Sequence, residues 1–506
     1  MMRPMMGKMG ELRTPSGGRI DRSRPLRFRF DDRDYTGFAG DTLASALLAN
    51  GVHLLGRSFK YHRPRGVLGA GAEEPNALVA VRRDSARVTP NLRATQVELY
   101  DGLEAYSQNR WPSLALDFGA VSGLLSPFIP AGFYYKTFMW PRDAWRRLYE
   151  PRIRAAAGLG RAPEQADPDT YANRFAHCDV LIVGAGPAGL AAAAAAAASG
   201  ARVILCDEQA EPGGSLLSEP AAHSDTAHSD AAHSGTAIAG EPAGRWLART
   251  LQMLAAHPRV TVLTRTTAFG YFPHNLLGLN QRLSDHLARP DHGQPRERQW
   301  QVRAREVVLA TGAIERPLVF PGNDRPGILL AAAARTYLNR YGTLAGLRAV
   351  VVTACDEAYR AALDLHRAGA TIVAIVDVRA ESPGLGAGAL PEAARRAGLP
   401  IEMQTTVLGT SGRLRVRAAR IQKLDSSGLP AGPARRLRCD LVLMSGGMTP
   451  SVHLFSQSRG KLAWEESLGA FLPAQAAERT HSAGACRGVF SLAAAVEDGT
   501  RAGLSA

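Results

Sequence analysis

The sequence predicts an α/β protein in which a small β-grasp domain precedes two Rossmann-type units. Three patterns carry this prediction. Residues 26–51 alternate as two strands should and then form a capped helical segment. Residues 179–207 have the pattern strand, glycine-rich turn, helix and strand, and residues 347–377 form a further strand–helix–strand pattern. Strands that alternate with helices indicate a parallel sheet with helices on its faces.

The glycine-rich turn is the most informative motif. A short apolar run, residues 179–183, leads into Gly184-Ala185-Gly186-Pro187-Ala188-Gly189, and an alanine-rich helical segment follows. In this context the first glycine permits the tight turn, the second lets the backbone approach a pyrophosphate, and the third lets the helix pack against the strand. The first amides of the helix point at the phosphates. The motif therefore predicts that the chain binds NAD or FAD.

Acidic residues end the second strand of this unit. Asp207 and Glu208 lie at the spacing where a carboxylate binds a ribose hydroxyl, and this spacing does not separate NAD from FAD. The residues that we predict to contact the cofactor here are Gly184, Gly186, Pro187, Ala188, Gly189, Asp207 and Glu208.

Two later turns are predicted to reach the same cofactor. Gly214 and Ser215 belong to a glycine turn that is common after the second strand of flavoprotein-like folds. Thr311 and Gly312 end the apolar strand at residues 307–310, where such folds bring the backbone close to the dinucleotide. An ordinary turn at the end of a strand is the alternative for Thr311 and Gly312.

The second Rossmann-type unit has a different turn. Between its first strand and its helix stands Thr353-Ala354-Cys355-Asp356-Glu357, so a thiol side chain and two acids replace the glycines. Side chains keep the backbone away from a pyrophosphate, and negative charge repels it. We expect this unit to keep the fold without holding a pyrophosphate in the usual way, which leaves one dinucleotide per chain.

The composition patterns along the chain predict the following organisation. Residues 1–25 form a disordered tail, residues 26–100 the β-grasp domain, and residues 101–172 an irregular connector rich in aromatic residues and proline. Residues 173–345 begin the first dinucleotide-binding domain, residues 346–438 form the degenerate second one, and residues 439–506 return to the first. A low-complexity insertion is expected at residues 219–240. Its repeat of Ala-His-Ser-Asp places His223, His228 and His233 in a disordered loop rather than a metal site.

Composition and charge exclude several classes of protein. With 45% hydrophobic and 21% charged residues the 506-residue chain is ordinary for a soluble protein. The net charge of +14 comes from scattered arginines without interleaved aromatic residues, so we expect no nucleic-acid partner. No apolar run approaches the ~20 residues of a membrane span, and no secretory signal starts the chain. We therefore expect a cytoplasmic protein without membrane contact.

The cysteines argue against metal and disulfide chemistry. Five cysteines are widely separated, no Cys-x-x-Cys motif occurs, and residues 26–110 contain no cysteine. We expect no metal site and no iron–sulfur cluster, because such clusters are held by closely spaced thiolates.

Several motifs together resemble one family. Residues 37–52, the segment Gly56-Arg57-Ser58-Phe59-Lys60-Tyr61-His62-Arg63-Pro64-Arg65-Gly66, and residues 73–77, 451–469 and 488–499 are similar to the α subunit of heterotetrameric sarcosine oxidase. The similarity spans about residues 26–506. The family's α subunit continues into a folate-binding domain that resembles aminomethyltransferases, whereas this sequence stops at Ala506. A fragment, a split subunit and a degenerate protein are the alternatives.

The resemblance implies a function. The chain would be the α-type subunit of an αβγδ complex that converts sarcosine to glycine, with NAD+ at Gly184, Gly186, Gly189 and Asp207. The FAD and FMN would belong to a β-type flavin oxidase subunit, accompanied by smaller γ- and δ-type subunits. No residue of this chain is identifiable as catalytic. The alternatives are an FAD-binding subunit of an opine, proline or amine dehydrogenase, and a non-catalytic nucleotide-binding scaffold.

Overall fold

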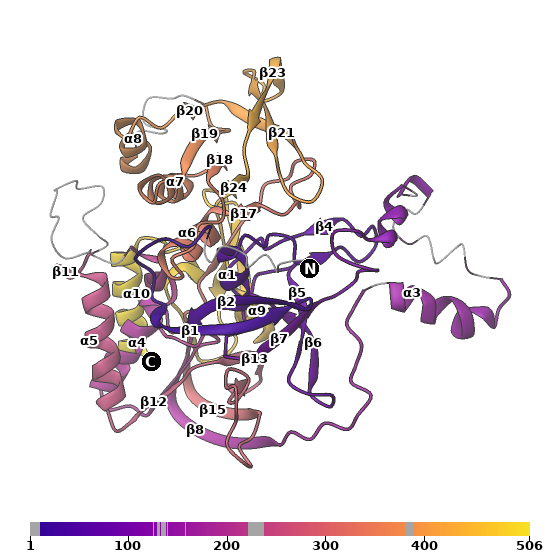
Figure 1. Ribbon diagram of the computed structural model, residues 1–506. Coiled ribbons are helices and arrows are strands. Elements are labelled where there is room, and N and C mark those ends of the chain that lie inside the picture. Colours follow the sequence, from indigo (N-terminus) through magenta and orange to yellow (C-terminus); the bar gives the residue numbers. More distant parts are fainter. Residues whose placement is uncertain are drawn as a thin grey trace. The chain divides into compact units, whose positions relative to one another are not determined.

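The computed structural model describes residues 11–124, 126–128, 132, 138, 140–156, 158–220, 237–380 and 388–506 (Figure 1). The chain divides into two compact units, each made of two stretches of sequence. Unit 1 comprises Met1–Pro168 and Pro317–Ser445, and unit 2 comprises Asp169–Arg316 and Gly446–Ala506. The predicted fold class is confirmed, since both units are α/β and a β-grasp sheet precedes the Rossmann-type sheets.

Unit 1 begins with a five-stranded sheet in the order β2-β1-β7-β5-β6. Its strands are β1 (Asp21–Phe30), β2 (Arg33–Ala39), β5 (Leu78–Arg82), β6 (Val88–Arg93) and β7 (Leu103–Ser107). Helix α1 (Leu43–Ala49) is buried along its whole length and starts at a capping box between Thr42 and Ser45. The two-residue strands β3 (Gly56–Arg57) and β4 (Pro64–Arg65) form a hairpin outside the sheet.

The structure corrects the expected limits of this domain. Residues 11–25 are not a tail: β1 starts at Asp21, and Arg13 forms an ion pair of 2.7 Å with the buried carboxylate of Asp41, which requires a cationic partner. Strand β7 lies within the expected connector but pairs with β1 and β5. Between β7 and residue 170, the described part of the connector contains only short helices, namely η1 (Phe118–Gly123), η2 (Ser126–Phe128), η3 (Trp145–Tyr149) and α3 (Glu150–Ala156).

A parallel sheet completes unit 1, in the order β17-β24-β18-β19-β20. Its strands are β17 (Ile328–Leu330), β18 (Arg348–Thr353), β19 (Thr371–Asp377), β20 (Ile401–Glu402) and β24 (Leu441–Ser445), and its helices are α6 (Ala331–Asn339), α7 (Glu357–Arg367) and α8 (Ala389–Arg396). The antiparallel strands β21 (Thr405–Ser411), β22 (Ala418–Leu424) and β23 (Pro430–Arg438) form a separate small sheet. The expected borders at residues 345 and 439 are wrong, because β24 pairs with both β17 and β18 and so holds residues 317–445 together.

Unit 2 is built on one mixed sheet in the order β12-β9-β8-β15-β14-β13, with β28 also paired to β15. Strands β8 (Tyr171–Val183), β9 (Val203–Cys206), β12 (Val260–Leu263), β15 (Glu297–Leu309) and β28 (Thr480–Ser482) are parallel, whereas β13 (Thr266–Phe272) and β14 (Leu276–Arg282) join β15 in an antiparallel meander. Helices α4 (Pro187–Ala198), α5 (Ala243–Ala256) and α10 (Leu492–Ser505) pack around the core that α4 shares with β8 and β9.

Shorter elements connect this sheet. They are η4 (Gly214–Ser218), β10 (Ala237–Ile238), β11 (Glu241–Pro242), β16 (Ala313–Glu315), β25 (Met448–Pro450), α9 (His453–Gln457), β26 (Lys461–Glu465), β27 (Ala470–Gln475) and η5 (Gly484–Arg487). Most of the predicted low-complexity insertion, residues 221–236 with its three histidines, lies outside the described residues.

Candidate functional site

Four parallel strands of unit 2 end side by side at one edge of the sheet. Backbone hydrogen bonds align the ends: the Gly184 amide donates to the Cys206 carbonyl at 2.8 Å, Ala310 to Val183 at 2.8 Å, and Ala483 to Leu309 at 2.9 Å. Ligands of parallel α/β sheets bind at the carboxyl ends of the strands. This edge is therefore the candidate cofactor site, and helix α4 begins there.

Two glycines of the turn are required by close backbone contacts. Gly184 has a φ of +100°, and a Cβ on it would lie 2.3 Å from the Ala310 carbonyl oxygen. A Cβ on Gly189 would lie 1.8 Å from the Gly184 carbonyl oxygen. Neither position accommodates a side chain, so these glycines permit the turn and the close contact of helix with strand, as the motif predicts.

Gly186 is different because space is open above it. The nearest atom to a Cβ on Gly186 is the Gly214 Cα at 4.0 Å. Gly186 is the N-cap of the 12-residue helix α4, and Pro187 occupies its first turn, where a missing N–H costs nothing. An anion above Gly186 would meet the positive end of the helix dipole and the amides that follow Pro187, including that of Ala188.

The predicted turn at Gly214 and Ser215 lies against this position. A Cβ on Gly214 would lie 2.8 Å from the Gly186 Cα, and Gly214 has a φ of +53°. The backbone of Gly214 therefore supports the glycine turn from the other side. Ser215 follows in η4 with an exposed side chain. The structure thus brings Gly186, Gly214 and Ser215 together.

Asp207 has a structural contact that the sequence did not reveal. Its Oδ2 accepts a hydrogen bond from the Ala185 amide at 2.6 Å, and its Oδ1 accepts one from the Gln209 amide at 2.8 Å. The carboxylate at the end of β9 thereby holds the glycine turn at the end of β8. Glu208, the next residue, is half-buried beside it. Two carboxylates with different surroundings thus stand where the ribose would bind.

Thr311 and Gly312 both form hydrogen bonds with Ser451 of the same chain. The Thr311 hydroxyl donates to the Ser451 carbonyl at 2.7 Å, and the Ser451 amide donates to the Gly312 carbonyl at 3.0 Å. The Thr311 side chain therefore fixes the return of the chain after β25. Gly312 has a φ of +74° with no atom within 4 Å of a Cβ, so its backbone lies beside open space.

Sequence reasoning missed Gly484 and Asp498. The Gly484 amide donates to the Asp498 Oδ2 at 2.9 Å, and Asp498 forms an ion pair of 2.8 Å with Arg487. A Cβ on Gly484 would lie 2.7 Å from the Ala188 Cβ in the first turn of α4. The segment after β28 therefore contacts the start of α4 at the candidate site. The signal was a glycine directly after a short strand, with Gly499 spaced one helical segment later.

Helix α10 approaches α4 closely because two glycines of α10 lie against the backbone of α4. A Cβ on Gly499 would lie 2.1 Å from the Ala188 carbonyl oxygen, and one on Gly503 would lie 2.3 Å from the Ala192 carbonyl oxygen. Small residues on both helices let the two backbones touch (Figure 1). The position of α4, and with it the glycine turn, is fixed by this contact.

The corresponding turn of unit 1 is filled by its own side chains. The Cys355 Sγ lies 3.2 Å from the Ser445 Oγ, and the Cys355 amide donates to the Thr353 hydroxyl at 3.0 Å. Asp377, which ends β19 and is fully buried, accepts a hydrogen bond from the Tyr359 hydroxyl at 2.8 Å and pairs with Arg379 at 2.7 Å. The carboxylate in the ribose position is thus already paired. That the chain holds one dinucleotide stays a prediction.

Burial raises the pKa of four thiols and keeps them protonated, namely those of Cys178, Cys206, Cys439 and Cys486. All five are free thiols. Burial raises the pKa of Cys178 to about 12 and that of Cys439 to about 11, and it raises the pKa of Cys206 further. Thiols with such pKa values are poor nucleophiles at neutral pH.

In the ranges given above, no group of three or more His, Cys, Asp or Glu side chains is placed to hold a metal ion. In the same ranges, no helix has the length and apolar character needed to cross a membrane.

Comparison with known proteins gives two family matches. Residues 178–471 match the family described as pyridine nucleotide-disulphide oxidoreductase, which is more than half of the chain. Residues 23–110 match the family described as 2Fe-2S iron-sulfur cluster binding domain.

The second match corrects an expectation. From the missing cysteines we expect no iron–sulfur cluster, and the match of residues 23–110 to this family contradicts that expectation. The expectation was wrong because it considered only the cysteine ligands of a cluster. The family match depends instead on the sequence pattern of residues 23–110 as a whole. Residues 23–110 contain no cysteine and so do not supply the usual thiolates.

Individual relatives extend over nearly the whole chain. Sarcosine oxidase subunit alpha from Rhizobium meliloti (strain 1021) is 48% identical over 97% of this chain and 46% of its own length. The protein of the same name from Corynebacterium sp. (strain U-96) is 38% identical over 96% of this chain and 44% of its own length. The chain thus spans about half the length of these relatives. Among solved structures, L-proline dehydrogenase from P. horikoshii is 17% identical and covers 98% of this chain and 75% of its own, with a TM-score of 0.63, which supports the fold.

Proposed function

Since the chain belongs to the pyridine nucleotide-disulphide oxidoreductase family, we propose that it is the NAD+-binding, α-type subunit of a sarcosine oxidase complex. The complex would demethylate sarcosine oxidatively to glycine, with the amine oxidised on a flavin of a partner subunit. The 48% identity to sarcosine oxidase subunit alpha over 97% of the chain carries this proposal.

The geometry of unit 2 supports a dinucleotide site. We assign the pyrophosphate to the open space above Gly186, where the amides at the start of α4 face an anion. Gly184, Gly189 and Gly214 shape the turn, and Thr311 and Gly312 border the same edge of the sheet. The ribose hydroxyls would bind Glu208 and Asp207, whose position at the end of β9 suits that contact.

The chain's own residues would bind and orient rather than react. The buried thiols of Cys178, Cys206 and Cys439 have raised pKa values, so they do not serve as exchanging thiolates. The turn at Cys355 is filled by hydrogen bonds among its own residues. In the proposed complex the chain therefore holds a dinucleotide and supports the subunit on which the amine is oxidised.

The partners follow from the same proposal. A β-type subunit would carry the FAD and FMN, and smaller γ- and δ-type subunits would complete the complex. The test is to combine this chain with the β-type subunit and measure sarcosine-dependent oxygen uptake. Activity that requires both proteins is expected, and activity of the β-type subunit that is indifferent to this chain would contradict the proposal.

The identity of the bound nucleotide distinguishes NAD+ from FAD as the cofactor of this chain. The purified chain is denatured and the released nucleotide is identified by absorbance and chromatography. NAD+ without a flavin spectrum is the expected result. Stoichiometric FAD would instead support an opine, proline or amine dehydrogenase subunit with its own redox centre, and a protein without nucleotide would support the non-catalytic scaffold.

A further inference from the structure

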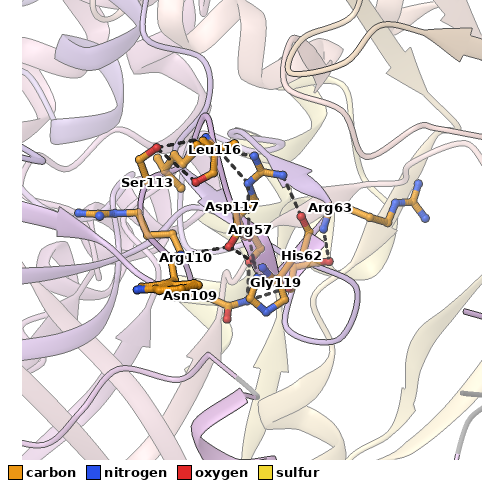
Figure 2. A network of polar contacts seen from close by, with 12 residues as sticks. Arg57, His62, Arg63, Asn109, Arg110, Ser113, Leu116, Asp117 and Gly119 are labelled. Carbon is orange, nitrogen blue, oxygen red and sulfur yellow. Dashed lines mark hydrogen bonds and ion pairs between the residues drawn. The ribbon is translucent and has the colours of Figure 1, made fainter. Parts of the chain in front are cut away.

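Several arginines of unit 1 are neutralised by carboxylates of the same unit. Three arginines labelled in Figure 2 show this: the Arg57 Nε lies 3.8 Å from the buried carboxylate of Asp117, and Arg63 and Arg110 pair with other aspartates at 2.6 Å and 3.0 Å. Their positive charge is therefore already balanced within the chain.

Arginines on the small sheet β21-β22-β23 of the same unit differ in this respect. Arg420 lies on the central strand β22, and Arg436 and Arg438 lie on β23. All three are exposed. Among the residues that the structure describes, none provides a hydrogen bond or an ion pair to these three guanidinium groups. Three unbalanced positive charges thus lie on one small sheet.

The register of the sheet places these three side chains on one face. Arg420 is directly opposite Arg436, and Arg438 follows two residues further along β23. Side chains that are directly opposite, or two residues apart on one strand, point to the same side of a sheet. The third strand, β21, contains no acidic residue and places Gly409 opposite Arg420. We call this side of the sheet, with Arg420, Arg436 and Arg438, the arginine face.

The other face of the sheet is built differently. Ala419 and Ile421 of β22 point to that side and are buried. Arg435, the neighbour of Arg436 on β23, also points there, and it pairs with Glu402 at 2.6 Å. The same strand therefore carries a balanced arginine on one side and unbalanced arginines on the other.

The arginine face is unfavourable for the chain alone. Like charges directly opposite each other destabilise a sheet, and Arg420 and Arg436 form such a pair. Charged side chains protect an exposed edge strand from pairing with other chains, which accounts for arginines on the edge strand β23. Arg420 lies on the central strand, where this protection does not apply. Anionic groups from outside the chain would offset the repulsion.

The chemistry of the face favours carboxylates of a polypeptide over phosphates of a nucleic acid. Guanidinium groups bind carboxylates through paired hydrogen bonds. Residues 401–440 contain no aromatic residue, so the sheet offers no ring on which the bases of a single strand could stack. A surface that binds duplex DNA neutralises about six to ten phosphates, which is more than three arginines supply. Alternate side chains of an extended polypeptide repeat at about 7 Å, as do alternate residues of β23.

We propose that the arginine face is the docking surface for an acidic segment of a partner polypeptide, whose carboxylates pair with Arg420, Arg436 and Arg438. The face contains none of the residues that we assign to the nucleotide. It is therefore a separate site, and its test does not depend on whether the chain binds NAD+.

The test uses the full chain and a fluorescein-labelled oligoglutamate peptide as the probe, with the Kd measured by fluorescence anisotropy at a fixed salt concentration. The variant Arg420→Ser/Arg436→Ser/Arg438→Ser should bind the peptide about 20-fold more weakly, since three charge pairs are lost. A Kd that stays within about 2-fold of the wild-type value would overturn the proposal.

The chain offers a control with the same loss of charge. Arg24, Arg27 and Arg245 are exposed arginines outside the sheet. Their replacement by serine should change the Kd by less than about 3-fold, because only the general field of the protein is altered. Equal losses in the two triple variants would show that net charge alone attracts the peptide, and would overturn the proposal.

The variant Arg420→Glu keeps the test decisive if the triple variant is poorly folded. Glutamate at this position would pair with Arg436 across the strands, so the free energy of unfolding should equal or exceed that of the wild type. Peptide binding should nevertheless weaken by about 10-fold, because a negative charge replaces a positive one on the face. Unchanged peptide binding by the folded Arg420→Glu variant would overturn the proposal.

An oligothymidylate with the same number of charges tests nucleic acid as the alternative partner. It should bind the wild-type chain more weakly than the oligoglutamate peptide at the same salt concentration. An oligothymidylate that binds more tightly than the peptide, and that loses this affinity in the arginine-face triple variant, would assign the face to nucleic acid and overturn the proposal.

Discussion

Unit 1 and unit 2 each contain a strand, a tight turn and a helix in the Rossmann arrangement, but different atoms fill the two turns. In unit 2 the turn after β8 is rich in glycine, and the atom nearest to a Cβ placed on Gly186 would be 4.0 Å away. In unit 1 the turn after β18 is occupied by Cys355, which contacts Ser445, and the acid at the end of β19 is paired with Tyr359 and Arg379. The same topology therefore leaves space for a ligand in unit 2 and forms a self-contained turn in unit 1.

The comparison teaches that the fold does not need the glycines that a ligand needs. In unit 2 the backbone leaves no room for a Cβ at Gly184 or Gly189. It does leave room for a Cβ at Gly186, so the fold itself does not require a glycine there. In unit 1 a hydroxyl, a thiol and an ion pair complete the turn without any glycine. Ligand-dependent and fold-dependent glycines can thus be separated by mutation.

The largest effect is expected for Gly184→Val. The new Cβ would lie 2.3 Å from the Ala310 carbonyl oxygen and would require a φ of +100°. We expect a loss of unfolding free energy of about 3 kcal/mol or more, with loss of bound nucleotide. Urea unfolding followed by circular dichroism measures it. The matched change in unit 1, Cys355→Gly, should cost only about 1 kcal/mol, and equal losses at the two turns would contradict the comparison.

Gly186→Val should separate binding from folding. The side chain enters open space, so the free energy of unfolding should change by less than about 1 kcal/mol, whereas nucleotide affinity should fall by about 100-fold because the valine occupies the pyrophosphate position. Isothermal titration with NAD+ and urea unfolding give the two readouts. Gly244→Val is the control, since Gly244 also has no atom within 4 Å of a Cβ. Full nucleotide binding by Gly186→Val would remove the pyrophosphate from this position.

Substitutions of the two carboxylates at the end of β9 should also separate an effect on the free energy of unfolding from an effect on nucleotide affinity. Asp207→Asn weakens the hydrogen bonds to the Ala185 and Gln209 amides and should cost about 1–2 kcal/mol of unfolding free energy. Glu208→Gln should lower NAD+ affinity by roughly 10-fold. Thermal unfolding and titration of both variants measure the two effects, and a loss of NAD+ affinity in Asp207→Asn alone would give the ribose to Asp207 alone.

A smaller, pH-dependent effect concerns unit 1. Burial, aided by the charge of Arg415, lowers the pKa of His53 from 6.5 to about 3, and neither ring nitrogen has a hydrogen-bond partner among the described residues. The unfolded chain therefore binds more protons than the folded chain between pH 6.5 and pH 3. Stability should fall as the pH is lowered through this window, by up to about 1.4 kcal/mol per pH unit from this group.

The variant His53→Leu isolates that contribution. Its unfolding free energy should vary less with pH below 6.5 than that of the wild type, while above pH 6.5 the two curves should run parallel. Urea unfolding at a series of pH values measures the difference. Identical slopes for both proteins would show that His53 is not the titrating group.

The parts of the fold that the sequence predicted are those with local signals. The strand, turn and helix around Gly184 could be predicted because hydrophobic periodicity and glycine spacing act within about ten residues. The borders of the units could not, because β24 is placed by pairing with β17 and β18, which lie about a hundred residues away. Arg13 belongs to the fold through an ion pair with Asp41, a hydrogen bond to the Tyr341 carbonyl and a β-bridge to Thr343, and nothing around Arg13 in the sequence indicates these partners.

The candidate site shows the same division. The glycines, the acids at the end of β9 and the turn at Thr311 were predicted from the motif and its spacing, and their contact with a cofactor stays a prediction. The support from Gly484 and Asp498 depends on a strand near the end of the chain pairing with β15, and the hydrogen bond from the Ala185 amide to Asp207 depends on the relative position of two strand ends. Long-range pairing of this kind has no local signal.

The central claim is that the open turn of unit 2 holds one NAD+ and the filled turn of unit 1 holds none. It is tested most directly by the nucleotide released on denaturation of the purified wild-type chain and of its Gly186→Val and Cys355→Gly variants, quantified per chain by chromatography. The account predicts about one NAD+ per wild-type chain, the same for Cys355→Gly, and none for Gly186→Val. Nucleotide that persists in Gly186→Val, or that disappears when Cys355 alone is changed, would contradict it.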